Sequence, residues 1–423
     1  MPPLKAVAVG LGHRTEVYSS YSLKHPDELQ IVGAADPDPG RLQRFAEKFD
    51  VPANACFATS AELAAQPRFA DVALNGTMDR QHVPTTLPLL EAGYDTLLEK
   101  PICPDRGELL QLLETSRRTD CKVMICHVLR YAPFYVEVRR RVADGEIGDL
   151  ISIRTVENVS YHHMAVGFVR GKWSRTADSN PMLLAKCCHD MDVVSWMHSG
   201  VRPLRVSSFG NLMYFRPENA PEGSGKRCLV DCRIEETCPY SARRNYIDQG
   251  RWGFYAWDSL EHIPNPTVEQ KLESLRTDNP YGRCVWQCDN DVVDHQSVIV
   301  EFEDGCVAAH DMVGNTARPC RTIHLVGTDG EIEGNMEEGK FVVRKPDARA
   351  GHEYSEEAVD MNLTGDMHGG GDLRLVGDFL RVVRGEKPSL STTDLMDSVN
   401  GHMIAFAADE SMHAHHVVEI ALP

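Results

Sequence analysis

Short apolar runs alternate with amphipathic segments over the first 130 residues of the chain. The apolar runs lie at residues 5–9, 30–36, 71–77, 95–101 and 122–130. Between them, segments such as residues 40–49 and 107–119 repeat apolar positions at the spacing of an α-helix. Strands that alternate with helices in this way predict parallel βαβ units, in which helices cover both faces of one sheet.

Beyond residue 150 the pattern changes to alternation of apolar and polar positions, which is typical of strands with one buried face. Such stretches lie at residues 151–160, 206–215, 295–305, 306–313 and 321–334. Short turns join several of them, so a large, mostly antiparallel open sheet is expected. Two later segments, residues 372–384 and 394–414, have helical spacing, and we expect both helices to pack on this second sheet.

The first strand runs into a turn that contains Gly10 and Gly12, and a helical pattern follows directly. In a dinucleotide-binding fold the first glycine allows a tight turn, the second lets the backbone approach a pyrophosphate, and the helix N-terminus faces the negative charge. Thr15 stands where a third glycine is expected. Asp36, which ends the second strand, has the position of a carboxylate that accepts ribose hydroxyls. It favours NAD over NADP because it repels a 2′-phosphate, although Arg41 keeps NADP open and Asp36 can also be a simple turn residue.

The stretch LLEKPI places Glu99 and Lys100 at the end of a buried strand, directly before a proline. Ligands of open α/β sheets bind at the carboxyl ends of the strands, so both side chains are expected at a binding crevice. A partly desolvated lysine there is expected to have a lowered pKa and to exchange a proton. The alternative is a surface ion pair that caps the strand.

The order of the motifs AVGLGHR, GAADPD, LNGTMDRQH, LLEKPI and RYAPFYVEVRRRVADGEIGDL resembles the Gfo/Idh/MocA oxidoreductases, which include glucose–fructose oxidoreductase and inositol dehydrogenase. The resemblance covers nearly the whole chain. It implies that residues 1–130 form an NAD-binding Rossmann domain with a doubly wound parallel sheet. Residues 131–423 then form an α+β domain that binds substrate and supports oligomerisation, and a homodimer or homotetramer is implied.

The resemblance also implies roles for individual residues. Lys100 would lie beside the nicotinamide and hydrogen-bond the reacting hydroxyl, Glu99 would orient the site, and Pro101 often follows a cis bond in the family. The implied cofactor contacts are Gly10, Gly12, His13, Arg14, Asp36, Thr77, His82, Glu99 and Lys100. For Thr77 and His82, ordinary turn and helix-start chemistry remains an alternative.

The stretch PMLLAKCCHDMDVVSWM, residues 181–197, matches the helix that carries catalytic groups in the family. His189 falls on the family's histidine, which makes it the expected general base, since imidazole accepts a proton near neutral pH. Ala185 stands where the family has an aspartate, and Lys186 or Asp190 is expected to substitute for it as a substrate contact. A satisfied core histidine is the alternative for His189.

Further substrate contacts are expected from three other parts of the chain. A C-P-Y-S-A loop of this kind recurs in one branch of the family and suggests that Tyr240 and Arg243 shape the pocket. Three glycines at residues 369–371 precede a helix, and His368 and Asp372 flank them. A helix N-cap explains Asp372 nearly as well. Tyr131 is a further candidate on the segment that follows the first domain.

Cysteines are concentrated between residues 228 and 288. Cys228, Cys232 and Cys238 lie close together, and Cys284 and Cys288 follow about fifty residues later. A structural zinc site with Cys228, Cys232, Cys238 and Cys288 as ligands is therefore an alternative. The spacings differ from the usual CxxC pair, so buried or free thiols without metal are favoured.

Composition excludes several classes of function. The net charge of −18 repels a polyphosphate backbone, so no nucleic-acid partner is expected. No apolar run reaches the roughly 20 residues of a membrane helix, and the N-terminus lacks the pattern of a signal peptide. Thirteen cysteines, an odd number, fit a reducing compartment. The chain is therefore expected to be cytoplasmic, with no membrane partner.

Three functions are compatible with these features. The favoured one is NAD-dependent oxidation or reduction of a secondary hydroxyl in a sugar, sugar acid or cyclitol. The alternative is a redox-neutral glycoside hydrolase or lyase that keeps its NAD bound, and the missing aspartate at Ala185 makes this divergence more plausible. The third is a non-catalytic dinucleotide-binding sensor, against which Lys100 argues because a sensor needs no proton-handling group.

Overall fold

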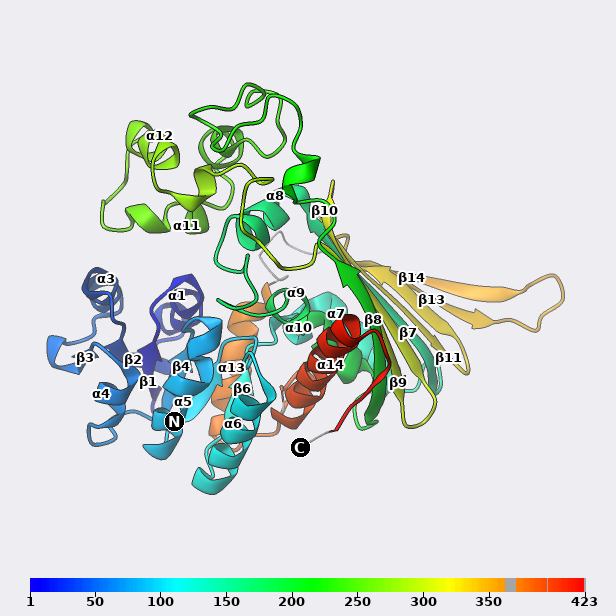
Figure 1. The fold of residues 1–423 in the computed structure, drawn as a ribbon. Coiled ribbons are helices and arrows are strands. Elements are labelled where there is room, and N and C mark those ends of the chain that lie inside the picture. Colours follow the sequence, from blue (N-terminus) through cyan, green and yellow to red (C-terminus); the bar gives the residue numbers. More distant parts are fainter. Residues whose placement is uncertain (362–369, 394, 422–423) are drawn as a thin grey trace.

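The computed structural model describes residues 1–361, 370–393 and 395–421. Figure 1 shows a parallel sheet built from the N-terminal residues and, beside it, a larger sheet built from later parts of the chain. The predicted fold class, a Rossmann-type domain followed by an α+β domain with a large, mostly antiparallel sheet, is therefore confirmed. None of the described helices is long and apolar enough to cross a membrane.

The N-terminal sheet has six parallel strands in the order β3-β2-β1-β4-β5-β6. The strands are β1 (Leu4–Val9), β2 (Leu29–Ala35), β3 (Cys56–Phe57), β4 (Val72–Asn75), β5 (Asp95–Leu98) and β6 (Val123–Ile125). The strand order reverses between β1 and β4, and in open α/β sheets this is the point where ligands bind at the carboxyl ends. The two-residue β3 was not predicted, because it is too short to show a periodic pattern.

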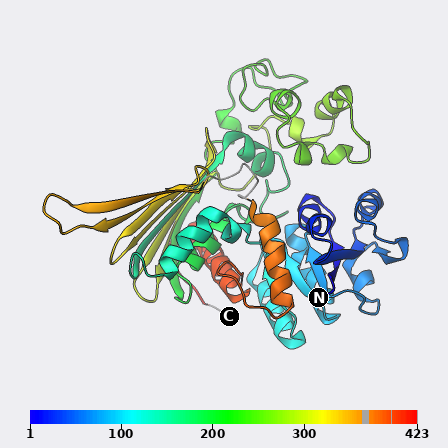
Figure 2. The same cartoon turned by 180° about the vertical axis from the view of Figure 1, so that it is seen from behind.

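Helices cover both faces of this sheet, as Figures 1 and 2 show. They are α1 (His13–Ser19), α2 (Tyr21–Lys24), α3 (Pro39–Phe49), α4 (Ser60–Ala64), α5 (His82–Glu91) and α6 (Arg106–Thr119). One further helix comes from the far end of the chain: α13 (Gly371–Val383) places Leu375 and Phe379 in the same apolar core as Ala6 and Tyr18. The prediction that α13 packs on the second sheet is wrong, because its apolar face completes the core of the N-terminal domain.

The second sheet has nine strands in the order β14-β13-β12-β11-β7-β10-β9-β8-β15, and only the β7–β10 pair is parallel. The strands are β7 (Leu150–Ser160), β8 (Pro203–Asn211), β9 (His295–Phe302), β10 (Val307–Thr316), β11 (Cys320–Gly327), β12 (Glu331–Asn335), β13 (Lys340–Pro346), β14 (Tyr354–Asp360) and β15 (Val418–Glu419). This long sheet extends away from the N-terminal domain (Figure 2).

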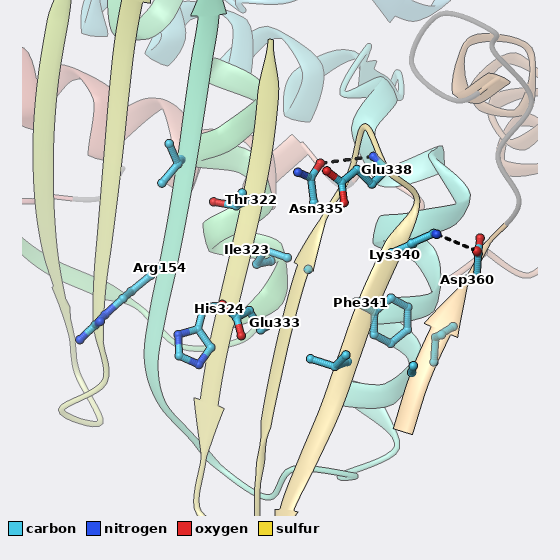
Figure 3. A pocket seen from close by; sticks show the side chains of 15 residues that line it. Arg154, Thr322, Ile323, His324, Glu333, Asn335, Glu338, Lys340, Phe341 and Asp360 are labelled. Carbon is cyan, nitrogen blue, oxygen red and sulfur yellow. Dashed lines mark hydrogen bonds and ion pairs between the residues drawn. The ribbon is translucent and has the colours of Figure 1, made fainter. Parts of the chain in front are cut away.

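Helices cover only one face of the second sheet. They are α7 (Pro133–Ala143), α10 (Cys188–Met197) and α14 (Leu395–Ala414). The side chains of β9 alternate accordingly: Val298 and Val300 are buried beneath the helices, whereas Ile299 is half exposed on the opposite face. That open face holds a hollow of about 580 Å³ over β7 and β11–β14, lined by charged and polar side chains such as Arg154 and Glu333 (Figure 3).

A long insertion joins β8 to β9, and we call residues 212–294 the cap. Its helices are short, among them α11 (Gly253–Ala256) and α12 (Val268–Arg276), and no named strand lies within it. In the view of Figure 1, α11 and α12 lie above α1 and α3 of the N-terminal domain. Sequence periodicity did not predict this module, because it has too little regular structure to repeat apolar positions.

The two domains are joined beneath the cap by a buried ion pair. Arg130, which follows β6, donates from Nε and Nη2 to the two carboxylate oxygens of Asp192 on α10, at 2.8 and 2.6 Å. Both side chains are at most 1% exposed, and the guanidinium also lies over the ring of Trp196. The geometry is bidentate, so the pair fixes α10 relative to the end of the first sheet.

We expect Asp192→Asn to destabilise the protein by about 3 kcal/mol, because the buried Arg130 would lose its bidentate partner and keep only the carboxylate of Asp397, 3.5 Å from Nη1. Midpoints of thermal and urea unfolding would measure this effect. Glu301→Gln, which removes the carboxylate from an exposed pair with Arg205, is the matched control and should change the midpoints little. Equal effects of the two substitutions would contradict the structural importance of the buried pair.

Candidate active site

The glycine turn after β1 is shaped for close approach of a ligand. Gly10 has a φ of +70°, and a Cβ there would meet the backbone of Thr77 at 2.6 Å, so only glycine fits. A Cβ on Gly12 would have no atom within 4 Å, which leaves its backbone open toward the crevice. Thr15 replaces the third glycine without a clash because Gly76 faces it: a Cβ on Gly76 would lie 2.2 Å from the Thr15 hydroxyl.

Asp36 holds the glycine turn and keeps capacity for a ligand. Its carboxylate accepts the backbone N–H of Leu11 at 2.7 Å and that of Asp38 at 2.9 Å. Two carboxylate oxygens have about four acceptor positions, so ribose hydroxyls can still bind. Arg41 lies 3.7 Å from Asp36 but donates to Glu261 of the cap at 3.0 Å, so its charge is already compensated. These residues therefore fit NAD, which is a dinucleotide without a 2′-phosphate.

Glu99 is a buried carboxylate held by three donors. Arg14 Nε and the Tyr18 hydroxyl each donate to Oε1 at 2.8 Å, and the backbone N–H of Lys100 donates to Oε2. Burial acts to raise the pKa of Glu99, but Arg14 and Lys100 outweigh burial and lower it. Glu99 is therefore an anion that orients Arg14 and the start of the next loop, as the predicted orienting role requires.

Lys100 follows β5 directly, and its Nζ donates to the carbonyl of Ala185 at 3.3 Å. Burial acts to lower the pKa of Lys100, but Cys188, Glu99 and Asp79 raise it above the usual value. Burial raises the pKa of the Cys188 thiol to about 12, so the two carboxylates supply the opposing charge at neutral pH. The predicted lowered pKa of Lys100 is therefore wrong: the lysine is a cation, because two carboxylates outweigh its desolvation.

His82 ties two loops of the crevice together. Its Nδ1 lies 2.6 Å from the carbonyl of Pro101 and its Nε2 lies 2.9 Å from the carbonyl of Thr77. The Lys100–Pro101 peptide bond is cis, as the family resemblance implied. Because both ring nitrogens lie close to backbone carbonyls and the side chain is buried, His82 positions the loops. Its contact with a cofactor stays a prediction.

His189 lies on α10, close to a second histidine that the sequence analysis missed. The ring of His127 lies 5.8 Å from the ring of His189, edge to face, and both side chains are buried. Burial, together with Arg130 and Lys100, holds the pKa of His127 well below its ordinary value, so His127 is neutral. His127 follows the end of β6, the last strand of the first sheet, and this position was the one signal in the sequence that could have revealed it as a site residue.

The two residues expected to replace the missing aspartate form a buried ionic network. Lys186 Nζ lies 2.7 Å from Glu157 of β7, and Arg321 of β11 lies 2.7 Å from Glu157 and 3.0 Å from Asp190. The four charges balance, so the protein itself satisfies them. Contact of Lys186 or Asp190 with a substrate stays a prediction.

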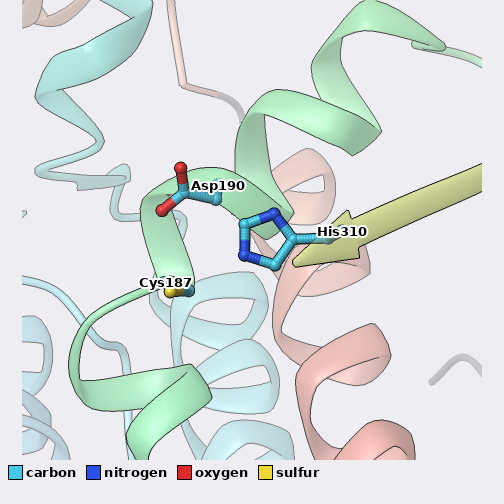
Figure 4. Close-up of side chains that lie close together, drawn as sticks. All are labelled: Cys187, Asp190 and His310. Carbon is cyan, nitrogen blue, oxygen red and sulfur yellow. The ribbon is translucent and has the colours of Figure 1, made fainter. Parts of the chain in front are cut away.

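One buried group has the composition of a metal site. Cys187, Asp190 and His310 place one potential ligand atom each within 4.8 Å of the others, and no other such group occurs among the described residues (Figure 4). Arg321 already donates to Asp190, and His310 Nδ1 is 2.8 Å from the hydroxyl of Thr155. A cation here would lie beside the Arg321 charge, so we assign no metal to this group.

Two of three predicted substrate contacts, Tyr131 and Tyr240, are engaged within the protein, and the third, Arg243, is exposed. The Tyr131 hydroxyl donates to Asp378 of α13 at 2.9 Å, and the Tyr240 hydroxyl is bonded to Asn315. Arg243 is exposed on the cap. The structure gives these three residues structural contacts or solvent exposure, and a role toward substrate stays a prediction.

The glycine-rich segment before α13 is only partly described. His368 lies outside the described residues. Asp372 pairs with Arg14, with 2.5 Å between Oδ1 and Nη2, and thereby links α13 to α1. The N-cap of α13 is Gly370, so Asp372 does not act as the helix cap.

Residues of the cap contact the edge of the first domain at which the glycine turn lies. The ring of Phe254 stacks on His13 with 4.7 Å between centroids, and Glu261 pairs with Arg41 and Arg44 at 3.0 and 3.2 Å. Burial and Arg14 lower the pKa of His13, so this ring is neutral when it stacks. These contacts join elements more than 200 residues apart, so local sequence patterns gave no signal for them.

Aromatic rings of the cap and of the segment before it surround the lysine side of the crevice. Trp252 stacks on His163 with 4.4 Å between centroids, and Trp173 donates from Nε1 to Asp79 at 3.2 Å. Burial raises the pKa of the half-buried Tyr255 hydroxyl, and the charge of Lys100 opposes this rise. The crevice therefore combines a cation, carboxylates and aromatic faces, which is the composition of a site for a small polar ligand.

Comparison with known proteins finds relatives that are named as oxidoreductases or dehydrogenases. Residues 4–127 match a family model described as "Oxidoreductase family, NAD-binding Rossmann fold". YteT of Bacillus subtilis, which is named as an oxidoreductase, is 25% identical over 409 residues, covering 90% of this chain and 88% of that protein. Inositol 2-dehydrogenase of Corynebacterium glutamicum is 27% identical over 202 residues, which is 48% of this chain and 54% of that enzyme.

Solved structures share the fold over the full length. A levoglucosan dehydrogenase in complex with NADH and L-sorbose superposes with a TM-score of 0.71 at 15% identity, covering 100% of both chains. The WlbA dehydrogenase in complex with NADH and UDP-GlcNAcA has a TM-score of 0.67, also at 15% identity, and covers 100% of this chain and 99% of that one. Residues 4–127 thus match the NAD-binding Rossmann domain of the Gfo/Idh/MocA oxidoreductase family, and the whole chain shares the two-domain fold of these dehydrogenases.

Proposed function

We propose that this oxidoreductase uses NAD to oxidise or reduce a secondary hydroxyl of a sugar, sugar acid or cyclitol. The observation that carries the proposal is the position of Lys100, a cation at the carboxyl end of β5, at the edge of the sheet where the glycine turn also lies. Related enzymes whose names state an inositol or an anhydrosugar as substrate support the substrate class.

When bound, NAD supplies the hydride acceptor, and the chain supplies position and proton handling. The Lys100 ammonium donates a hydrogen bond to the reacting oxygen and stabilises negative charge that develops there. His189 takes the hydroxyl proton as general base.

A redox-neutral glycoside hydrolase or lyase is the second candidate, because two observations favour a cofactor that stays bound. Ala185 replaces the acidic substrate contact, and its carbonyl accepts from Lys100 instead. The cap contacts at His13 and Arg41 lie over the nucleotide side of the crevice. A cofactor that cannot exchange between turnovers must be returned to its starting redox state by the same substrate.

We also propose that two copies of the chain associate through the open face of the large sheet. Phe209 and Ile299 are 70% and 52% exposed on this face, on the neighbouring strands β8 and β9. The hollow over β11–β14 contributes side chains of both charges, such as Lys340 and Asp360 (Figure 3). An exposed apolar surface with a mixed polar rim is typical of an interface between copies.

Lys100→Met should reduce turnover by roughly 100-fold or more, because the cation no longer stabilises the reacting oxygen. NAD affinity and thermal stability should change little, and calorimetry and melting curves would check both. Lys122→Met, on an exposed lysine before β6, is the matched control and should retain full activity. Unchanged turnover of the Lys100 variant would contradict its assigned role.

Denatured wild-type protein should release NAD in near-stoichiometric amount if the cap retains the cofactor. Glu261→Gln should accelerate NAD release roughly two- to fivefold, because it breaks the pairs with Arg41 and Arg44. Glu269→Gln, which affects only a pair within the cap, serves as control. Retained NAD together with glycoside cleavage and no NADH would select the redox-neutral reaction; an empty site with substrate-dependent NADH would select an ordinary dehydrogenase.

The double variant Phe209→Asp/Ile299→Asp should shift the protein from an oligomer to a monomer in analytical ultracentrifugation, because charges on the apolar surface oppose its burial. Leu23→Asp places a charge on an equally exposed apolar position of α2 and is the matched control. An unchanged sedimentation coefficient of the double variant would exclude this face as the interface.

A further inference from the structure

We propose that the cap contains a structural zinc site formed by the thiolates of Cys228, Cys232, Cys238 and Cys284. These four side chains line one small cavity of about 10 Å³, which has room for a single ion. Three of the cysteines come from one segment, and the fourth comes from a second segment about fifty residues later. Four thiolates around an enclosed space match the closed ligand set of structural zinc sites.

Backbone hydrogen bonds hold these two segments side by side. The N–H of Cys228 donates to the carbonyl of Gly282 at 2.9 Å, and the N–H of Cys284 donates to the carbonyl of Lys226 at 2.9 Å. In this antiparallel bridge Arg227 lies opposite Arg283, so Cys228 and Cys284 are diagonal to each other on the same side of the bridge. The protein therefore provides half of the ligand set on a fixed backbone.

The other two thiols need only a small movement. No three of the four sulfur atoms lie within 4.8 Å of one another, although all four belong to the described part of the chain. Tetrahedral zinc with bonds of about 2.3 Å separates its sulfur ligands by about 3.8 Å. Cys232 and Cys238 lie in a segment of turns between residues 228 and 240, which can contract without disturbing a helix or a strand.

A buried arginine beside the cavity provides an independent argument. Arg170 is 2% exposed, and no carboxylate of the described residues lies within 4.0 Å of it. Its guanidinium donates to the carbonyls of Arg283 and Tyr240 at 2.6 and 2.9 Å, to the Tyr246 hydroxyl at 3.2 Å and to Cys228 Sγ at 3.4 Å. An arginine is always charged, and a buried charge without a counter-ion is costly. Zinc with four thiolates carries a net charge of −2 and would supply that counter-ion.

The architecture of the cap explains why a metal would be useful there. The cap has no long helix, and its own apolar core is small: Tyr246, Ala256 and Leu275 pack with Cys228 and a few neighbours. Small modules with little core are usually stabilised by metals or disulfides. A metal at this place would fix the base of the segment that carries Phe254 and Glu261 over the crevice.

The structure also changes the ligand set expected from the sequence. Cys288 was the fourth ligand in the less favoured zinc alternative, but its thiol donates to the carbonyl of Cys284 at 3.2 Å and does not line the cavity. Cys284 lines it instead. The spacing in the sequence could not separate the two, because they lie only one turn apart.

The test is elemental analysis of protein purified without chelator from zinc-supplemented cells. We expect about one zinc ion per chain in the wild type, in Cys288→Ser and in Cys187→Ser, and loss of most of the zinc in Cys284→Ser. Cys288→Ser is the matched control, since it removes a neighbouring thiol outside the cavity. Cys187→Ser separates this site from the buried group of Cys187, Asp190 and His310.

A second measurement keeps the test informative if Cys284→Ser fails to fold. Titration of the wild-type protein with an organomercurial should release zinc as four thiols react. A separate, untreated sample denatured with chelator and without reductant should show 13 free thiols. Absence of stoichiometric metal, disulfides among the four cysteines, or loss of zinc in Cys187→Ser with retention in Cys284→Ser would each overturn the proposal.

Discussion

The negative charge of Glu99 is the constraint on which the crevice depends. It is buried, so it requires the Arg14 guanidinium and the Tyr18 hydroxyl, and these draw α1 against the end of β5. Arg14 in turn holds Asp372, which brings a helix from the far end of the chain into the first domain. The same carboxylate helps to keep Lys100 protonated. One buried acid thus sets both the position of the helix and the charge of the lysine.

The parts of the fold that could be predicted are those in which local patterns repeat. Alternating strands and helices identified the first sheet, period-two strands identified the second, and the glycine turn and Lys100 marked the crevice. The cap lacks such periodicity, and α13 has a helical pattern that does not reveal which core its apolar face joins. Composition and residue spacing do not tell which of the two cores a helix such as α13 joins.

Electrostatics within the site could not be predicted for a related reason. The desolvation of Lys100 was foreseeable from its place at a strand end. Its effect on the pKa is outweighed by surrounding groups, among them Glu99 and, from a different loop, Asp79. His127 and Arg130 follow the last strand without forming any motif, and their importance comes from α10, which lies about 60 residues later. Charges that act across such distances become visible only when the chain is folded.

The attachment of the cap has a consequence for how this enzyme can change. β8 and β9 are neighbouring antiparallel strands, and Asn211 pairs with His295, so the cap leaves and re-enters the sheet at a single point. An insertion at such a point alters the sheet little, since the thermodynamic cost of a longer connection grows only slowly with its length. The cap can therefore change in length or sequence while the pairing of β8 with β9 and the parallel sheet of the first domain keep their geometry.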